Sequence, residues 1–324
     1  MRYGLALTKL FPKCLTTGIY LWSGYAAISS ITIISTRTVA FAVAGITLVA
    51  LYTYYKIIFV GPGTTIDFPS LKVRDMHAAE NGLELPPEFV TKRSFTLKKD
   101  GRFRICVVCH SWKPDRCHHC SSCNQCILKM DHHCPWFAEC VGYRNQKYFI
   151  QFLLYSITYS ILILIVTSLE LYSWFQEEGF EKELIDFTLL ALWLLAVVIS
   201  ISLGIFTIFS IAQLCLNQTT IELYRLRRYK EEIAFLNEFS NEPIKGAVNI
   251  FDLGSWKANW KDVMGTNLIE WCLPIRNSRS SSDGNGLFFN VNKNIKNNLA
   301  ESMDLQDRLL RRVTPRNSLD IERQ

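Results

Sequence analysis

Four apolar runs dominate this sequence, and each is long enough to cross a lipid bilayer as a helix, which takes about 20 residues. They cover Cys14–Ser35, Val39–Val60, Tyr148–Leu171 and Phe187–Leu216. Only 20% of the 324 residues are charged, whereas soluble domains carry roughly a quarter. A soluble helical protein with four such runs would have too little polar surface. The runs therefore predict an all-α integral membrane protein with four transmembrane helices.

The basic residues predict the orientation of these helices. The segment Gly61–Lys147 carries 13 of the 35 Lys and Arg residues, and Asn217–Gln324 carries 16. The loop Ser173–Asp186 has only Lys182 against five acids. Because cytosolic segments are enriched in Lys and Arg, we expect both long segments and both termini in the cytosol, where thiols stay reduced.

The same boundaries divide the chain into five parts. Residues 1–60 form an N-terminal tail with spans one and two, 61–147 a cytosolic cysteine-rich domain, and 148–216 spans three and four. Residues 217–276 form a cytosolic C-terminal segment, and 277–324, rich in Ser, Asn and Arg, a mostly disordered tail. The composition gives no reason to expect a nucleic-acid partner; the expected partner is the bilayer.

Residues 106–140 hold eight of the eleven cysteines and five of the six histidines. A disulfide framework would not recruit histidines, whereas zinc sites use both residue types in Cys-x2-Cys spacing. Iron–sulfur clusters rarely mix in so many histidines. The pattern reads Cys106-x2-Cys109, His118-His119-Cys120-x2-Cys123-x2-Cys126, Asp131-His132-His133-Cys134 and Cys140.

Two structural zinc ions need eight ligands, so five of these thirteen candidates are surplus. Spacing alone does not say which five. Cys134 stands beside Asp131, His132 and His133, and a thiol next to an imidazole that a carboxylate orients is the arrangement of an activated nucleophile. The alternative is that Cys134 is a redundant ninth ligand.

Three motifs together resemble the DHHC family of protein S-palmitoyltransferases. Asp131-His132-His133-Cys134 lies in the cysteine-rich spacing between spans two and three. Thr219-Thr220-Ile221-Glu222 looks like the family's TTxE motif, and Phe251–Gly254 with Asn259-Trp260 looks like its C-terminal conserved segment. The stretch Trp136–Cys140 is similar to the vacuolar branch of the fungal members.

The resemblance implies a role for each site residue. Cys134 is the acyl-accepting nucleophile, His132 its base and Asp131 the orienter of that base. Thr220 is expected to bond Asp131, and Glu222 and Asn259 to support the site. His110, Cys117 and His118 receive no role. The implied ligands of two structural Zn²⁺ ions are Cys106, Cys109, His119 and Cys126 for one, and Cys120, Cys123, His133 and Cys140 for the other.

The resemblance also implies a reaction and an address. Palmitoyl-CoA would acylate Cys134, and the acyl group would pass to cysteines of peripheral proteins at the cytosolic face, including a vacuolar armadillo-repeat protein. The expected location is the vacuole membrane. Candidates to meet the CoA phosphates are the basic residues Lys113, Arg116, Lys129, Arg144 and Lys147.

Two other functions compete with acyl transfer. A membrane-tethered zinc adaptor or ubiquitin ligase would also need eight ligands, but it would have no use for an extra thiol at Cys134. A channel or transporter would need ionisable groups along its spans, and the runs hold only Lys56 and Glu170 near their ends, with Lys13 just before the first.

Overall fold

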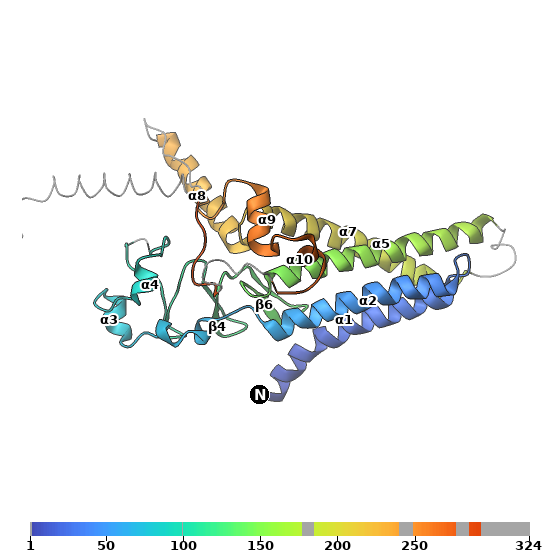
Figure 1. The fold of residues 1–324 in the computed structure, drawn as a ribbon, viewed down its shortest axis with the longest axis horizontal. Helices are drawn as coiled ribbons and strands as arrows, with labels where there is room; N and C mark the ends of the chain where they lie inside the picture. The colour runs from blue at the N-terminus through green and yellow to red at the C-terminus, as the bar shows by residue number, and fades with distance from the viewer. Residues whose placement is uncertain (1, 99, 177–184, 240–248, 277–284, 293–324) are drawn as a thin grey trace, which may run out of the picture.

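The computed structural model describes residues 2–98, 100–176, 185–239, 249–276 and 285–292. Its long membrane-type helices are α1 (Arg2–Ser30), α2 (Thr36–Val60), α5 (Gln146–Gln176) and α7 (Phe187–Cys215). Figure 1 shows these helices side by side as an elongated bundle. The cysteine-rich segment between α2 and α5 lies at one end of that bundle, together with the helices that follow α7 (Figure 1).

Within the described residues, three helices are long and apolar enough to cross a membrane: α2, α5 and α7. Each overlaps the run predicted for it, so the helical architecture of a membrane protein is confirmed. A fourth span is not confirmed, because α1 does not reach the same apolar character. Hydroxyl-bearing residues such as Thr17, Tyr20 and Ser23 interrupt the apolar residues of α1.

An acidic side chain of α5 holds the turn between α1 and α2. Glu170 accepts hydrogen bonds from the backbone amides of Thr32 and Ile33, at 2.9 and 3.2 Å, and from the Thr32 hydroxyl at 2.6 Å. Glu170 is buried, and these donors satisfy its carboxylate. This acid therefore stabilises a turn, which agrees with the argument against an ion pathway.

The cysteine-rich segment begins with short helices and ends in three antiparallel hairpins. The helices are η1 (Thr65–Asp67), η2 (Pro69–Leu71), α3 (Met76–Glu80) and α4 (Glu88–Thr91). The hairpins pair β1 (Ile105–Cys106) with β2 (Ser111–Trp112), β3 (His118–Cys120) with β4 (Gln125–Ile127), and β5 (His132–Cys134) with β6 (Glu139–Val141). Because isolated two-stranded hairpins are marginally stable in water, strands this short need a further cross-link.

After α7 the chain forms α8 (Thr220–Phe239), α9 (Trp256–Met264) and α10 (Leu268–Cys272). Residues 285–292 then pack back on the cysteine-rich segment, where Leu287 is buried and the Phe289 ring lies 5.1 Å from the Arg116 guanidinium. These residues belong to the stretch 277–324 that the sequence predicts to be mostly disordered. The rest of that stretch lies outside the described residues.

A hydrophobic core joins the bundle to hairpin β5–β6. Cys134 belongs to this core and is only 6% exposed. The thiol therefore lies where the cysteine-rich segment meets the end of the membrane-type helices. The core also includes buried side chains from α2, the hairpin, α5, α7 and α9: Tyr54, Phe137, Phe149, Leu214 and Met264.

Candidate active site and metal centres

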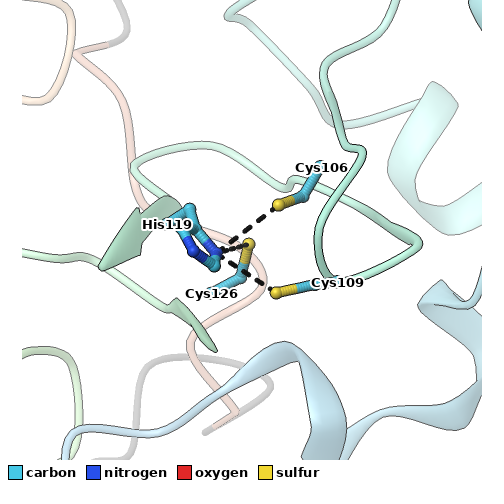
Figure 2. A group of neighbouring side chains, drawn as sticks. All are labelled: Cys106, Cys109, His119 and Cys126. Atoms are coloured by element: carbon cyan, nitrogen blue, oxygen red, sulfur yellow. Dashed lines mark hydrogen bonds between the residues drawn. The ribbon is translucent and has the colours of Figure 1, made fainter. Parts of the chain in front are cut away.

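The first Cys/His group consists of Cys106, Cys109, His119 and Cys126. Figure 2 shows the three sulfur atoms gathered on one side of the His119 ring, facing one of its nitrogen atoms. The His119 Nδ1 atom lies 3.6 Å from the Cys106 sulfur, 3.2 Å from that of Cys109 and 4.0 Å from that of Cys126. The register of hairpin β3–β4 places His119 opposite Cys126, so this group ties the first hairpin to the second.

The second group consists of Cys120, Cys123, His133 and Cys140. The His133 Nδ1 atom lies 3.7 Å from the Cys120 sulfur, 3.3 Å from that of Cys123 and 3.6 Å from that of Cys140. The register of hairpin β5–β6 places His133 opposite Cys140. This group therefore ties the second hairpin to the third.

Both groups fit a tetrahedral zinc ion. Zn–S bonds of about 2.3 Å and Zn–N bonds of about 2.0 Å put neighbouring ligand atoms roughly 3.6 Å apart on a tetrahedron. The nitrogen–sulfur distances of 3.2 to 4.0 Å lie around that value. Four protein ligands leave no open position, which is typical of structural zinc. The structure gathers the eight cysteines and histidines in the same two groups that the family resemblance implied.

The two groups are copies of one pattern, and the second copy follows the first by 14 residues. A third copy would begin at Cys134, which has the place of Cys120. The pattern then requires a cysteine at position 137, where the chain has Phe137. Cys134 thus stands at the first position of a metal-binding turn whose other ligands are missing. This repeat separates Cys134 from the ligands without reference to a family, and the sequence analysis missed it.

Strand alternation divides the neighbouring residues of β5 between two tasks. Successive side chains of a strand point to opposite faces. His133 points to the face where Cys140 and the second metal group lie. His132 and Cys134 share the other face, where Cys134 enters the core and the His132 ring contacts Phe149 at 5.3 Å between centroids.

Asp131 connects His132 to the start of α8. One carboxylate oxygen lies 2.7 Å from His132 Nδ1. The other accepts hydrogen bonds from the Thr220 backbone amide at 2.7 Å and from the Thr220 hydroxyl at 3.0 Å. The structure therefore brings Thr220 and Asp131 together, as the sequence predicts, and fixes the carboxylate on both sides.

The same contacts act on the protonation of the imidazole. Burial lowers the pKa of His132, but Asp131 and the Cys134 thiol outweigh burial and raise that pKa to about 9. Burial likewise raises the pKa of Asp131, and the bonds to His132 and Thr220 overcome it and hold the pKa below its ordinary value. The site therefore favours a carboxylate next to an imidazole that binds a proton readily, which is what a base for a thiol requires.

The TTxE motif also caps helix α8. The Glu222 amide donates to the Thr219 hydroxyl at 3.3 Å, and the Glu222 carboxylate accepts from the Thr219 amide at 2.9 Å. This reciprocal pair is a capping box. Thr219 thus forms the helix cap, and Thr220 is left to bond Asp131.

Glu222 has a second partner, Arg116, which the sequence analysis named as a candidate for CoA contact. The Arg116 side chain, only 1% exposed, forms two bonds to the Glu222 carboxylate at 2.8 and 2.9 Å. It also bonds the side chain and carbonyl of Asn217 at 3.0 and 2.9 Å. Burial raises the pKa of Glu222, but Arg116 outweighs burial and lowers it. Arg116 therefore joins the cysteine-rich segment to the α7–α8 junction.

Asn259 supports that junction from α9. Its side-chain amide donates to the carbonyl of Cys215, the last residue of α7, and to the Asp252 carboxylate, both at 2.8 Å. Its side-chain oxygen accepts from the Leu253 amide at 2.9 Å. Because the last carbonyls of a helix lack partners inside the helix, Asn259 satisfies one of them and anchors the C-terminal segment.

Three of the five candidates for CoA contact are buried: Arg116, Lys129 and Lys147. Burial, together with the neighbouring Arg116 charge, lowers the pKa of Lys129 to about 8. Arg144 pairs with Asp67 at 2.9 Å. Two of the buried cations have partners inside the fold: Arg116 bonds Glu222, and Lys147 donates to the carbonyl of Ile275.

A cavity of about 210 Å³ opens beside the Asp131–His132 pair, between α5, α7 and the start of α8. Its walls combine phenylalanine rings with amide and hydroxyl groups. Such a mixture is typical of ligand sites, which place a few polar groups in an apolar lining. The lining residues are Asp131, His132, Gln146, Phe149, Ile150, Phe206, Phe209, Ser210, Gln213, Gln218, Thr220 and Tyr224.

Comparison with known proteins identifies close relatives of this chain. Residues 99–227 match the DHHC palmitoyltransferase family. The chain is 65% identical to Palmitoyltransferase PFA3 of Candida glabrata, over 98% of this chain and 97% of that protein. It is 56% identical to Palmitoyltransferase PFA3 of Saccharomyces cerevisiae, over 98% and 96%. Palmitoyltransferase ZDHHC2 of Danio rerio is 35% identical over 60% of this chain and 49% of its own length.

Proposed function

Because the chain belongs to the DHHC palmitoyltransferase family and is a protein S-palmitoyltransferase, we propose that it transfers the acyl group in two steps through a thioester on Cys134. In the first step His132 takes the proton of the Cys134 thiol. The thiolate attacks the thioester carbonyl of palmitoyl-CoA, and the CoA thiolate leaves with the proton held by His132.

The second step repeats the first with a protein cysteine as nucleophile. His132 takes the proton of the substrate thiol, the new thiolate attacks the acylated Cys134, and Cys134 leaves as a thiolate that regains the proton. Asp131 keeps Nδ1 of His132 occupied, so that the other ring nitrogen faces the reacting thiols. A positioned base raises the thiolate fraction of a cysteine, which is only a few per cent for a free thiol near neutral pH.

One observation carries this proposal: the division of residues along β5. His133 lies in a complete group of four metal ligands, whereas Cys134 shares the opposite face with His132, which Asp131 and Thr220 hold in place. A zinc adaptor or ubiquitin ligase would give no reason for this chain of hydrogen bonds, and the named relatives are palmitoyltransferases.

We assign the two metal groups to structural Zn²⁺. Bound zinc would supply cross-links between hairpins that are too short to be stable alone. Cys109 and Cys123 lie in the turns, and His119 and His133 lie in the strands, so each group would fix a turn to the following hairpin.

Palmitoyl-CoA as donor fits the location of Cys134. Moving one CH₂ group from water to an apolar environment is worth about 0.8 kcal/mol, so a long acyl chain stays among apolar side chains while the CoA head remains in water. Cys134 lies at that boundary, within the core at the end of the bundle. We infer that the acceptors are cysteines of peripheral proteins at the cytosolic face of the vacuole membrane, including an armadillo-repeat protein, as resemblance to the vacuolar branch implies.

We propose that α1 is the fourth span and that both termini are cytosolic. Partners inside the bundle satisfy the hydroxyl groups of α1: Tyr20 bonds Ser156 at 2.7 Å, and Ser23 lies 2.8 Å from the Tyr159 hydroxyl. A glycosylation acceptor inserted in the loop 173–186 should then be modified, and one inserted near Asp100 should not. The reverse result would contradict this topology.

A transfer experiment tests the two-step reaction. The purified protein is incubated with radiolabelled palmitoyl-CoA, freed of it by gel filtration, and then mixed with a cysteine-containing acceptor peptide. The label should move from the protein to the peptide without further donor. In a sample that receives hydroxylamine in place of the peptide, the label should be released from the protein. Transfer that requires donor and acceptor at the same time would refute the acyl-enzyme.

A further inference from the structure

The segment 268–275, which includes α10, presents apolar side chains to the outside of the protein. Leu268 and Ile269 are 69% and 65% exposed, and Leu273 and Ile275 are also exposed. We call these four residues the α10 patch. α10 lies beside the first turns of α5 (Figure 1), so the patch adjoins the surface that the membrane-type helices present to lipid.

Side chains of α5 satisfy the backbone of this segment. Gln151 lies within 2.8 to 3.0 Å of the carbonyl oxygens of Glu270, Trp271 and Leu273. Tyr155 donates its hydroxyl to the carbonyl of Cys272.

Two lysines at the ends of neighbouring helices complete the set. Lys56 of α2 donates to the carbonyl of Pro274, and Lys147 of α5 donates to the carbonyl of Ile275 at 2.9 Å. All six carbonyls from residue 270 to residue 275 thus lie within hydrogen-bonding distance of donors from the bundle, and three of them share the two hydrogens of the Gln151 amide. Water satisfies such groups on an ordinary surface loop, whereas irregular backbone at membrane depth needs protein partners.

The position of the donors along α5 gives the depth. The helix has 31 residues and is about 46 Å long at about 1.5 Å per residue. A hydrocarbon core of about 30 Å, centred on it, leaves about 8 Å of helix outside at each end. Tyr155 stands nine residues after Gln146, about 13 Å along the axis. The backbone of Tyr155 therefore lies about 5 Å inside the edge of the hydrocarbon, and its hydroxyl reaches the carbonyl of Cys272.

We propose that the α10 patch inserts into the acyl-chain region of the leaflet next to the active site. Three features favour lipid as the occupant. The apolar side chains are exposed, the backbone carbonyls have protein donors in place of water, and the patch adjoins the membrane-type helices. Glu270 faces inward instead, where its carboxylate accepts from the amides of Thr266 and Asn267 at 2.7 and 3.3 Å. No charged side chain lies between Leu268 and Ile275 other than this buried one.

Insertion would also tie the membrane to the active-site core. α10 follows α9 after a short turn, and Val263 and Met264 of α9 pack in the core that contains Cys134. The inserted segment would therefore fix the depth of the Cys134 thiol relative to the leaflet. The acyl chain and the acceptor proteins at the membrane surface both approach from this leaflet.

Photo-crosslinking tests the proposal on the intact protein. The full chain is reconstituted in phosphatidylcholine nanodiscs that contain a phospholipid with a diazirine on its acyl chain, irradiated, digested and mapped by mass spectrometry. Peptides covering 268–275 should carry lipid adducts at a level comparable to peptides of α7, whose Val198 and Ile201 are exposed. Leu83 and Leu85, 82% and 64% exposed in the cysteine-rich segment, provide the control peptide.

The expected result is labelling of 268–275 several-fold above the Leu83–Leu85 peptide. Labelling equal to that control, with α7 labelled normally, would overturn the proposal. A variant adds a second readout: Leu268→Asp with Ile269→Asp should lose the adducts on 268–275 and keep those on α7. Unchanged labelling in this variant would show that the adducts do not report insertion of the patch.

Discussion

The two adjacent threonines of the TTxE motif should separate catalysis from stability. Thr220→Val keeps the side-chain volume and the amide bond from residue 220 to Asp131 at 2.7 Å, and it removes only the hydroxyl bond at 3.0 Å. A hydrogen bond to a charged group contributes about 1.5–3 kcal/mol. Because the remaining amide still holds the same oxygen, we expect the lower end, about 1.5 kcal/mol. This energy corresponds to roughly tenfold slower acylation.

Thr219→Val is the matched control. It removes the hydroxyl that accepts from the Glu222 amide in the capping box, and loss of such a cap lowers stability by about 1 kcal/mol. The acylation rate of the folded enzyme should stay near that of the wild type, because it is Thr220 that donates to Asp131, through its amide and its hydroxyl.

The assay is single-turnover acylation. Purified protein in excess is mixed with palmitoyl-CoA, quenched at intervals and scored for acyl-protein, with rates normalised to folded, zinc-loaded enzyme. A wild-type rate in Thr220→Val would refute the claim that its hydroxyl positions the Asp131–His132 pair. Equal rate losses in both variants would show that the motif acts only through the stability of α8.

Three further predictions concern the metal centres and the buried ion pair. Arg116→Met should destabilise the protein by about 3–5 kcal/mol because it leaves the partly buried Glu222 carboxylate without its cationic partner. Adding Glu222→Gln should recover part of this loss in thermal denaturation, and no recovery would contradict the pairing. His133→Ala should release one zinc ion per chain, whereas His132→Ala should keep both zinc ions and slow acylation. Elemental analysis that finds equal zinc loss in both variants would contradict the assignment of His133 to the metal group and of His132 to the base. A strong chelator should abolish acylation together with the protease resistance of the hairpins, and added zinc should restore both; acylation that survives complete metal removal would contradict a structural role for zinc.

The parts of the fold that a bilayer dictates could be predicted from the sequence. The runs of α2, α5 and α7 are recognisable because a helix in lipid must be apolar along its whole length. The run Cys14–Ser35 was predicted to span in the same way, but α1 is less apolar than the other three helices, and its hydroxyl groups find partners only in the folded bundle. Tyr20 and Ser23, for example, each pair with residues 136 positions away.

The chemistry of the site could be predicted only in part. Spacing identified thirteen zinc-ligand candidates but not which eight serve, and the family resemblance supplied the grouping. The 14-residue repeat, with Phe137 in place of a cysteine, was available in the sequence and would have set Cys134 apart.

Contacts between distant segments were beyond the sequence. Arg116 was named as a candidate for CoA contact, yet its partner Glu222 is 106 residues away, and no local pattern indicates such a pair. The packing of Phe289 near Arg116 and Lys129 was equally hidden within a tail of polar composition. Both cations are buried by segments that follow the last long helix.

Native mass spectrometry of the wild type and of Cys134→Ser tests the central claim most directly, because one spectrum reports both the bound zinc and the acyl adduct. After incubation with palmitoyl-CoA, the wild type should show two zinc ions and one hydroxylamine-sensitive acyl group per chain. Cys134→Ser should show two zinc ions and no acyl group. A Cys134→Ser chain that has lost one zinc ion, or that still carries the acyl group, would contradict the assignment of Cys134 as the nucleophile.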